Sequence, residues 1–216
     1  MQHRRALPYL AYLFGLVLAC SLAHPALAHP HVWITASTEV VFSDGKFTEL
    51  RHHWTFDAAY TAYAIQGLGS SDGTLSPSQL RLLAKLNTEA LGEFGYFTIM
   101  KTNDQAQAFT PPRDYAMALE KGQLTLTFTL PVKTPSLSDL PLSFSFNDPT
   151  YFVSFTLAEG DNAVQLIDAP QPCVAKVTRP PPAIPSQTFS EAFFQALSTQ
   201  SSLGSDFTIR ALITCH

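Results

Sequence analysis

One alternating stretch near the N-terminus constrains the fold of this chain more than any other feature. Across residues 31–42, a mostly apolar set of side chains alternates with a mostly polar set, which is typical of a β-strand with one buried face. Ser43-Asp44-Gly45-Lys46 is a tight-turn signal, and residues 47–56 return as a second strand. The sequence therefore predicts an N-terminal β-hairpin. The mostly apolar set consists of Val32, Ile34, Ala36, Thr38, Val40 and Phe42.

Most of the remaining chain is predicted to form short strands. One helix is predicted to begin at Ser76-Pro77 and to end at Gly92 or Gly95, a second covers residues 189–197, and residues 57–67 are a candidate for a further short helix. The buried stripe of the first helix is predicted to be Leu80, Leu83, Leu86 and Leu91. Strands are predicted at 96–102, 115–119, 124–131, 142–146, 151–157, 163–168, 174–178 and 207–213. The predicted fold class is mainly β, either an antiparallel β-sandwich or an open α+β sheet with two short-to-medium helices.

The first 28 residues have the organisation of a signal peptide. Arg4 and Arg5 precede an apolar stretch over residues 6–23, and Ala26-Leu27-Ala28 supplies the small residues of a cleavage site. An uncleaved anchor and lipoprotein processing at Cys20 are alternatives, although the bulky Leu18 fits a lipobox poorly. Cleavage after Ala28 would leave residues 29–216 as a single β-rich periplasmic domain. The formal net charge is −4 and there is no long basic run, which argues against a nucleic-acid partner.

Two cysteines, Cys173 and Cys215, follow the predicted leader. An even number of cysteines in an oxidising compartment indicates a disulfide bond. The alternative is a metal site that uses both thiols, but it lacks the usual Cys-x-x-Cys spacing. We therefore expect a bond between Cys173 and Cys215.

The predicted mature N-terminus begins His29-Pro30-His31. A histidine with a free α-amine offers two metal-binding nitrogens, and the imidazole of His31 adds a third. Imidazole suits zinc, nickel, cobalt and copper. Pro30 has no N–H, which excludes a chelate through the second backbone amide. The alternative is that both histidines are exposed polar residues at a frayed chain end.

Hairpin register selects further candidates for this site. With a two-residue loop at Asp44-Gly45, His53 lies opposite Ala36, about 16 Å along the sheet from His31 at ~3.3 Å per residue. One metal ion cannot join the two, so His52 and His53 are excluded and are interpreted as a polar strand face. Asp57 is predicted to lie beside Val32, as a metal ligand or as a hydrogen-bond acceptor. Its alternative role is to cap the helix that follows.

A further carboxylate, Asp148, belongs to the run Asn147-Asp148-Pro149-Thr150, which is typical of a turn before an aromatic strand. We take Asp148 as a fourth candidate metal residue, although sequence spacing alone does not place it near His31. The chain has no G-x-S-x-G, Walker, dinucleotide-binding or H-E-x-x-H motif, so no enzyme class is predicted.

The motifs in combination resemble a bacterial protein family of unknown function, number 1007. They are the His-Pro-His-Val-Trp-Ile run after the leader, Trp54-Thr55-Phe56-Asp57, the Asp148-Pro149-Thr150-Tyr151-Phe152 run and the terminal Cys215. The resemblance covers essentially the whole chain after the leader. It implies a periplasmic component of an ABC-type transport system, associated with nickel, cobalt or zinc.

Three functions are consistent with these features. We expect an exported metal-binding accessory protein that binds a divalent ion (zinc, nickel, cobalt or copper) through His29, His31, Asp57 and Asp148 and serves an inner-membrane transporter or permease. One alternative is a metal-free interaction module that docks on a transporter. The other is a copper-dependent redox enzyme that uses the N-terminal histidine.

Overall fold

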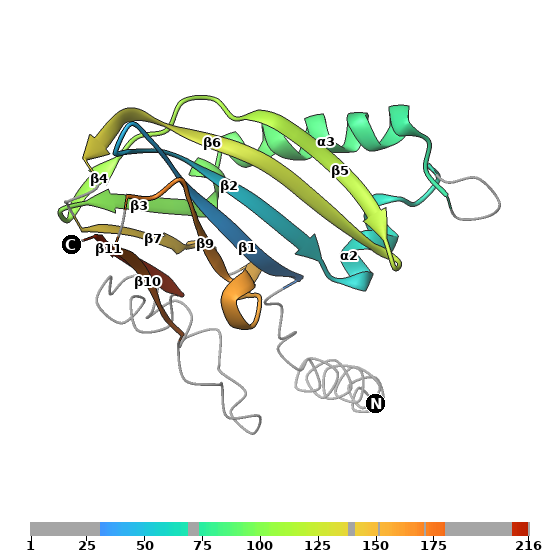
Figure 1. The fold of residues 1–216 in the computed structure, drawn as a ribbon. Coiled ribbons are helices and arrows are strands. Elements are labelled where there is room, and N and C mark those ends of the chain that lie inside the picture. The colour runs from blue at the N-terminus through green and yellow to red at the C-terminus, as the bar shows by residue number, and fades with distance from the viewer. Residues whose placement is uncertain are drawn as a thin grey trace, which may run out of the picture.

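The computed structural model describes residues 31–68, 74–137, 141–150, 152–170, 172–179 and 209–215. The predicted leader, His29 and the helix predicted over residues 189–197 lie outside these residues. Within them, the chain forms two β-sheets and two α-helices (Figure 1). The prediction of a mainly β fold is confirmed.

The larger sheet contains both strands of the predicted hairpin. Its strand order is β5-β6-β2-β1-β8, and β9 also pairs with β1. The strands β1 and β2 are antiparallel, whereas β8 and β9 run parallel to β1. The parallel pairs bring the segment after Asp148 alongside the start of β1. The strands are β1 (Val32–Ser43), β2 (Lys46–Phe56), β5 (Arg113–Glu120), β6 (Gln123–Leu137), β8 (Val153–Leu157) and β9 (Val164–Ile167).

The smaller sheet has the order β10-β11-β7-β3-β4, with every neighbouring pair antiparallel. Its strands are β3 (Thr98–Thr102), β4 (Gln105–Gln107), β7 (Leu142–Phe146), β10 (Cys173–Thr178) and β11 (Arg210–Cys215). Cys173 lies directly opposite Cys215 in the β10–β11 pair, and the two are joined by a disulfide bond. The predicted disulfide is therefore confirmed.

The helices are α2 (Ala58–Ala64) and α3 (Pro77–Gly92), and short 3-10 turns lie at η1 (Gly95–Phe97) and η2 (Gly160–Asn162). The helix α3 runs alongside β5 (Figure 1). Ser76 and Gln79 form a reciprocal capping box, with Pro77 in the first turn, so the predicted start is confirmed. The predicted stripe is wrong at one position: Leu83 is buried, but Leu86 is 52 % exposed. No helix among the described residues is long and apolar enough to cross a membrane.

The β1–β2 hairpin turns at Asp44 and Gly45, which both adopt positive φ as this kind of tight turn requires. Next to the turn the predicted register holds, because Phe42 pairs with Phe47. A β-bulge then shifts the register by one residue, so that Val41 pairs with Glu49. As a result His53 lies opposite Ser37, not Ala36, and the N–H of Asp57 donates to the carbonyl of Trp33, not of Val32.

The core lies between the facing sheets and contains His52. This side chain is fully buried, with Nδ1 3.0 Å from the hydroxyl of Thr38. The rings of Trp54, Phe128 and Phe146 lie within 6 Å of its own ring centroid. The interpretation of His52 as part of a polar strand face is therefore wrong. His53 does lie on the outer face, where its Nε2 is 3.7 Å from the carboxylate of Glu39.

Candidate functional site

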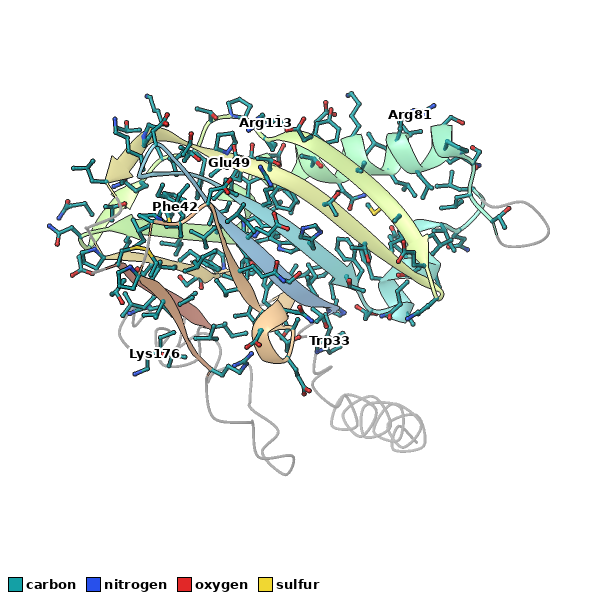
Figure 2. The ribbon with its side chains drawn as sticks, viewed as in Figure 1. Trp33, Phe42, Glu49, Arg81, Arg113 and Lys176 are labelled. Atoms are coloured by element: carbon teal, nitrogen blue, oxygen red, sulfur yellow. A yellow bond between two sulfur atoms is a disulfide. The ribbon has the colours of Figure 1, made fainter. Side chains whose placement is uncertain are left out.

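The candidate site lies at the end of the larger sheet where β1 begins. His31 is exposed there, and its backbone N–H donates to the carbonyl of Phe152 at 2.9 Å. The His31 and Phe152 ring centroids are 4.9 Å apart. Figure 2 shows Trp33 at the opposite end of β1 from Phe42. This arrangement makes the start of β1 an accessible end of the sheet, with an imidazole on it.

Asp57 lies at this end and caps α2. Its Oδ1 accepts hydrogen bonds from the N–H groups of Ala59 and Tyr60 at 2.8 and 2.9 Å, and its Oδ2 accepts one from the N–H of Trp33 at 2.8 Å. Slight burial raises the pKa of Asp57, but these backbone donors and its own N–H outweigh burial and hold the pKa below its ordinary value. The capping role that the sequence left open is present in the structure.

Asp148 repeats this scheme in the loop before β8. Its Oδ1 accepts from both the N–H and the hydroxyl of Thr150, at 2.8 and 2.7 Å. Its Oδ2 accepts from the N–H of Val153 at 2.8 Å. The residue is only 6 % exposed. Because Val153 lies opposite Val32 in the β1–β8 pair, Asp148 fixes the strand that flanks the start of β1.

Two carboxylates far apart in the sequence thus tie the start of β1 to its neighbours. Asp57 ties it to the end of β2, and Asp148 orders the start of β8 beside it. In each carboxylate Oδ1 accepts two hydrogen bonds and Oδ2 accepts one. A carboxylate has about four acceptor positions. One position on each Oδ2 is therefore not used by these hydrogen bonds.

The structure describes three of the four predicted metal residues. His31, Asp57 and Asp148 meet the same end of the larger sheet, by the register and hydrogen bonds above. His29 lies outside the described residues. His53 lies opposite Ser37, six residues along β1 from His31. Within the described residues, no three potential metal ligands are grouped closely enough to hold an ion.

A pocket of about 360 Å³ opens beside this strand end and is lined by residues of both α3 and β1. Sequence patterns did not predict this pocket, because its walls come from four stretches of the chain that are far apart in the sequence. The strand β1 supplies Val32 and Ile34, and α3 supplies Asn87, Ala90 and Leu91. The remaining lining residues are Phe56, Tyr60, Phe94, Phe97, Asp148, Thr150, Phe152 and Val153.

One polar pair joins two walls of this pocket. The hydroxyl of Tyr60 in α2 donates to Oδ1 of Asn87 in α3 at 2.6 Å, and Nδ2 of Asn87 donates to the carbonyl of Leu83. Burial raises the pKa of the Tyr60 hydroxyl, and neighbouring Tyr63 adds to the effect. Tyr60 therefore remains a neutral hydrogen-bond donor at neutral pH.

The fold and the site together define a two-sheet β protein with an exposed histidine at one strand end. The capping residue Asp57 and the buried Asp148 hold that strand end in place. The chain belongs to the family described as "Protein of unknown function (DUF1007)", which matches residues 14–215. No curated protein matches this chain. The family resemblance expected from the sequence is thus confirmed, and its description names no activity, metal or transporter.

Proposed function

We propose that this chain is an exported, periplasmic metal-binding accessory protein linked to the transport of a divalent ion such as nickel, cobalt or zinc. One observation carries the proposal. The exposed imidazole of His31 stands at the strand end that Asp57 and Asp148 fix through six hydrogen bonds. An ordered strand end limits the freedom that a chelating residue loses when it binds an ion.

Three of the proposed ligands are nitrogen atoms. His29, if it is the first residue after cleavage, contributes its α-amine and imidazole, and His31 contributes a second imidazole. These three nitrogens suit zinc, nickel, cobalt or copper. A carboxylate oxygen can complete a four-coordinate site. The candidate for that ligand is Oδ2 of Asp57 or Asp148, which accepts one of the hydrogen bonds described above.

The carboxylates have a second role in this proposal. Most of their acceptor positions hold backbone N–H groups, so their main effect is to position the strand that bears His31. Hydrogen-bonded supports of this kind commonly tune metal affinity. Loss of either acid would then weaken metal binding even if neither one contacts the ion.

Export is supported by the disulfide bond between Cys173 and Cys215, because such bonds persist in oxidising compartments. The predicted signal peptide over residues 1–28 gives the route, and cleavage after Ala28 gives the free amine. The proposed partner is an inner-membrane metal transporter or permease, which would receive the ion from the exposed strand end.

Calorimetry on four forms of the protein tests the proposal. Protein that begins at His29 should bind one zinc, nickel or copper ion, and one extra residue before His29 should weaken that binding by at least about tenfold, because it removes the α-amine as a ligand. His31→Ala should also weaken binding. His53→Ala is the matched control, since His53 lies on the same hairpin but remote from the site. Equal affinity of all four proteins would contradict the proposal.

A further inference from the structure

The pocket lined by residues of α3 and β1 has the size of a ligand site. Its volume of about 360 Å³ falls at the lower end of the ~300–1,000 Å³ that pockets for small organic molecules occupy. The rings of Phe94 and Phe152 line it and are 51 % and 46 % exposed. Solvent therefore reaches the pocket past aromatic side chains, and a ligand can enter without unfolding any strand.

The walls of the pocket are mainly apolar and carry few polar side chains. Most lining residues are apolar, and five of them carry aromatic rings: Phe56, Tyr60, Phe94, Phe97 and Phe152. Asp148 supplies the one formally charged side chain among the described residues of the lining, which include no lysine, arginine or histidine. An apolar body would bury against these walls, and a positive group would meet both a carboxylate and aromatic faces.

Asp148 is well placed to discriminate by charge. It is 6 % exposed, so water screens its charge less than it would at the surface. Its three hydrogen bonds hold the carboxylate in a fixed position and leave one acceptor position on Oδ2. The faces of aromatic rings also attract cations. An anionic ligand would meet repulsion from the same carboxylate.

We propose that this pocket binds a small organic cation, a protonated amine on an aromatic or aliphatic body. The carboxylate of Asp148 receives the ammonium group, and the phenylalanine side chains cover the apolar body. This site requires no metal ion, but it uses the carboxylate of Asp148, which is also a candidate ligand of the proposed metal site. Phe152 connects the two, since it lines the pocket and its ring lies 4.9 Å from that of His31.

Three probes of matched shape test the charge preference on metal-free protein kept in a chelator. They are 4-phenylbutylamine, 4-phenylbutan-1-ol and 4-phenylbutanoate, titrated by calorimetry or followed by NMR. We expect the amine to bind roughly tenfold more tightly than the alcohol, and the carboxylate to bind most weakly. Equal affinities, tighter binding of the carboxylate, or no binding of the amine would overturn the proposal.

Variants locate the binding. Ala90→Phe, on the exposed face of α3, fills the pocket and should abolish amine binding. Ala62→Phe is the matched control, because Ala62 is exposed on α2 and does not line the pocket. Asp148→Asn should remove the preference for the amine over the alcohol while alcohol binding persists, which also shows that the pocket remains folded. Amine binding unchanged in Ala90→Phe would refute the site. Since no probe step uses metal, failure here leaves the metal proposal standing, and the reverse also holds.

Discussion

The backbone N–H of Trp33 donates to Oδ2 of Asp57 at 2.8 Å, and the N–H of Asp57 donates back to the carbonyl of Trp33 at 2.9 Å. This reciprocal pair extends the β1–β2 ladder by one residue beyond Phe56, and the same carboxylate starts α2. One side chain therefore joins the first strand, the second strand and the helix that follows.

Asp57→Ala should destabilise the protein by about 1–3 kcal/mol, because it removes a helix cap and leaves the N–H of Trp33 without its carboxylate partner. Since the pKa of Asp57 is lowered in the folded state, this contribution is present above the unfolded value of 3.8 and is lost as the pH falls through the folded value. Urea unfolding at neutral pH measures the effect. Asp161→Ala, at an exposed position, is the control, and equal stability of the two variants would contradict this role.

His52 predicts a different pH dependence. Burial lowers the pKa of His52 from 6.5 to about 3, and the neighbouring His53 adds to the effect. The unfolded chain therefore binds the proton more readily, so protonation favours unfolding. The free energy of unfolding should fall by up to about 1.4 kcal/mol per pH unit as the pH drops from 6.5 towards 3.

His52→Phe, which keeps an aromatic ring in the core but cannot titrate, should flatten that slope in unfolding curves between pH 6.5 and 4. His31→Ala serves as the comparison, because His31 is exposed. The same steep slope in His52→Phe would show that other groups cause the acid sensitivity.

Two leucines of α3 that differ in burial, Leu83 and Leu86, test the packing of this helix. Leu83→Ala should cost about 2–5 kcal/mol, because the side chain is buried in the core. Leu86→Ala should change the stability by less than about 0.5 kcal/mol, since Leu86 is half exposed. Thermal or urea unfolding of the two variants measures these losses of stability. Similar losses for both would support the helix face that the sequence predicted and contradict the structure.

The disulfide bond between Cys173 and Cys215 closes a loop with a sequence separation of 42 residues. Replacing both cysteines with serine should lower the free energy of unfolding by about 2–4 kcal/mol, mainly because the unfolded chain gains freedom. A reducing agent should destabilise the natural protein by a similar amount and should have no effect on the double variant. A reductant effect that persists in the double variant would argue against this explanation.

Local patterns accounted for the hairpin, α3 and the disulfide, because each depends on residues whose spacing is visible in the chain. Alternation defined β1, a serine and a proline defined the start of α3, and Cys173 and Cys215 were the two cysteines after the predicted leader. These features require no knowledge of which distant segments meet.

The remaining features depend on distant partners. Because of the β-bulge near Val41, Asp57 pairs with Trp33 and not with Val32 as the sequence predicted. The turn residues of a hairpin do not indicate whether a bulge is present. His52 looks polar in the sequence, but its core position follows from that shifted strand and the facing sheet. Asp148 lies near the start of β1 because β8 pairs with β1 in parallel. Alternation of apolar and polar residues cannot predict that pairing.

The proposed function requires an exported protein that starts at His29 and holds a divalent ion there. The intact mass of the protein recovered from the periplasm, measured under native conditions, reports both the first residue and the bound metal. We predict the mass of residues 29–216, reduced by the two thiol hydrogens lost on disulfide formation and increased by one divalent metal ion, which His31→Ala should release. A protein that starts elsewhere, or that carries no metal after growth with added zinc and nickel, would contradict the account.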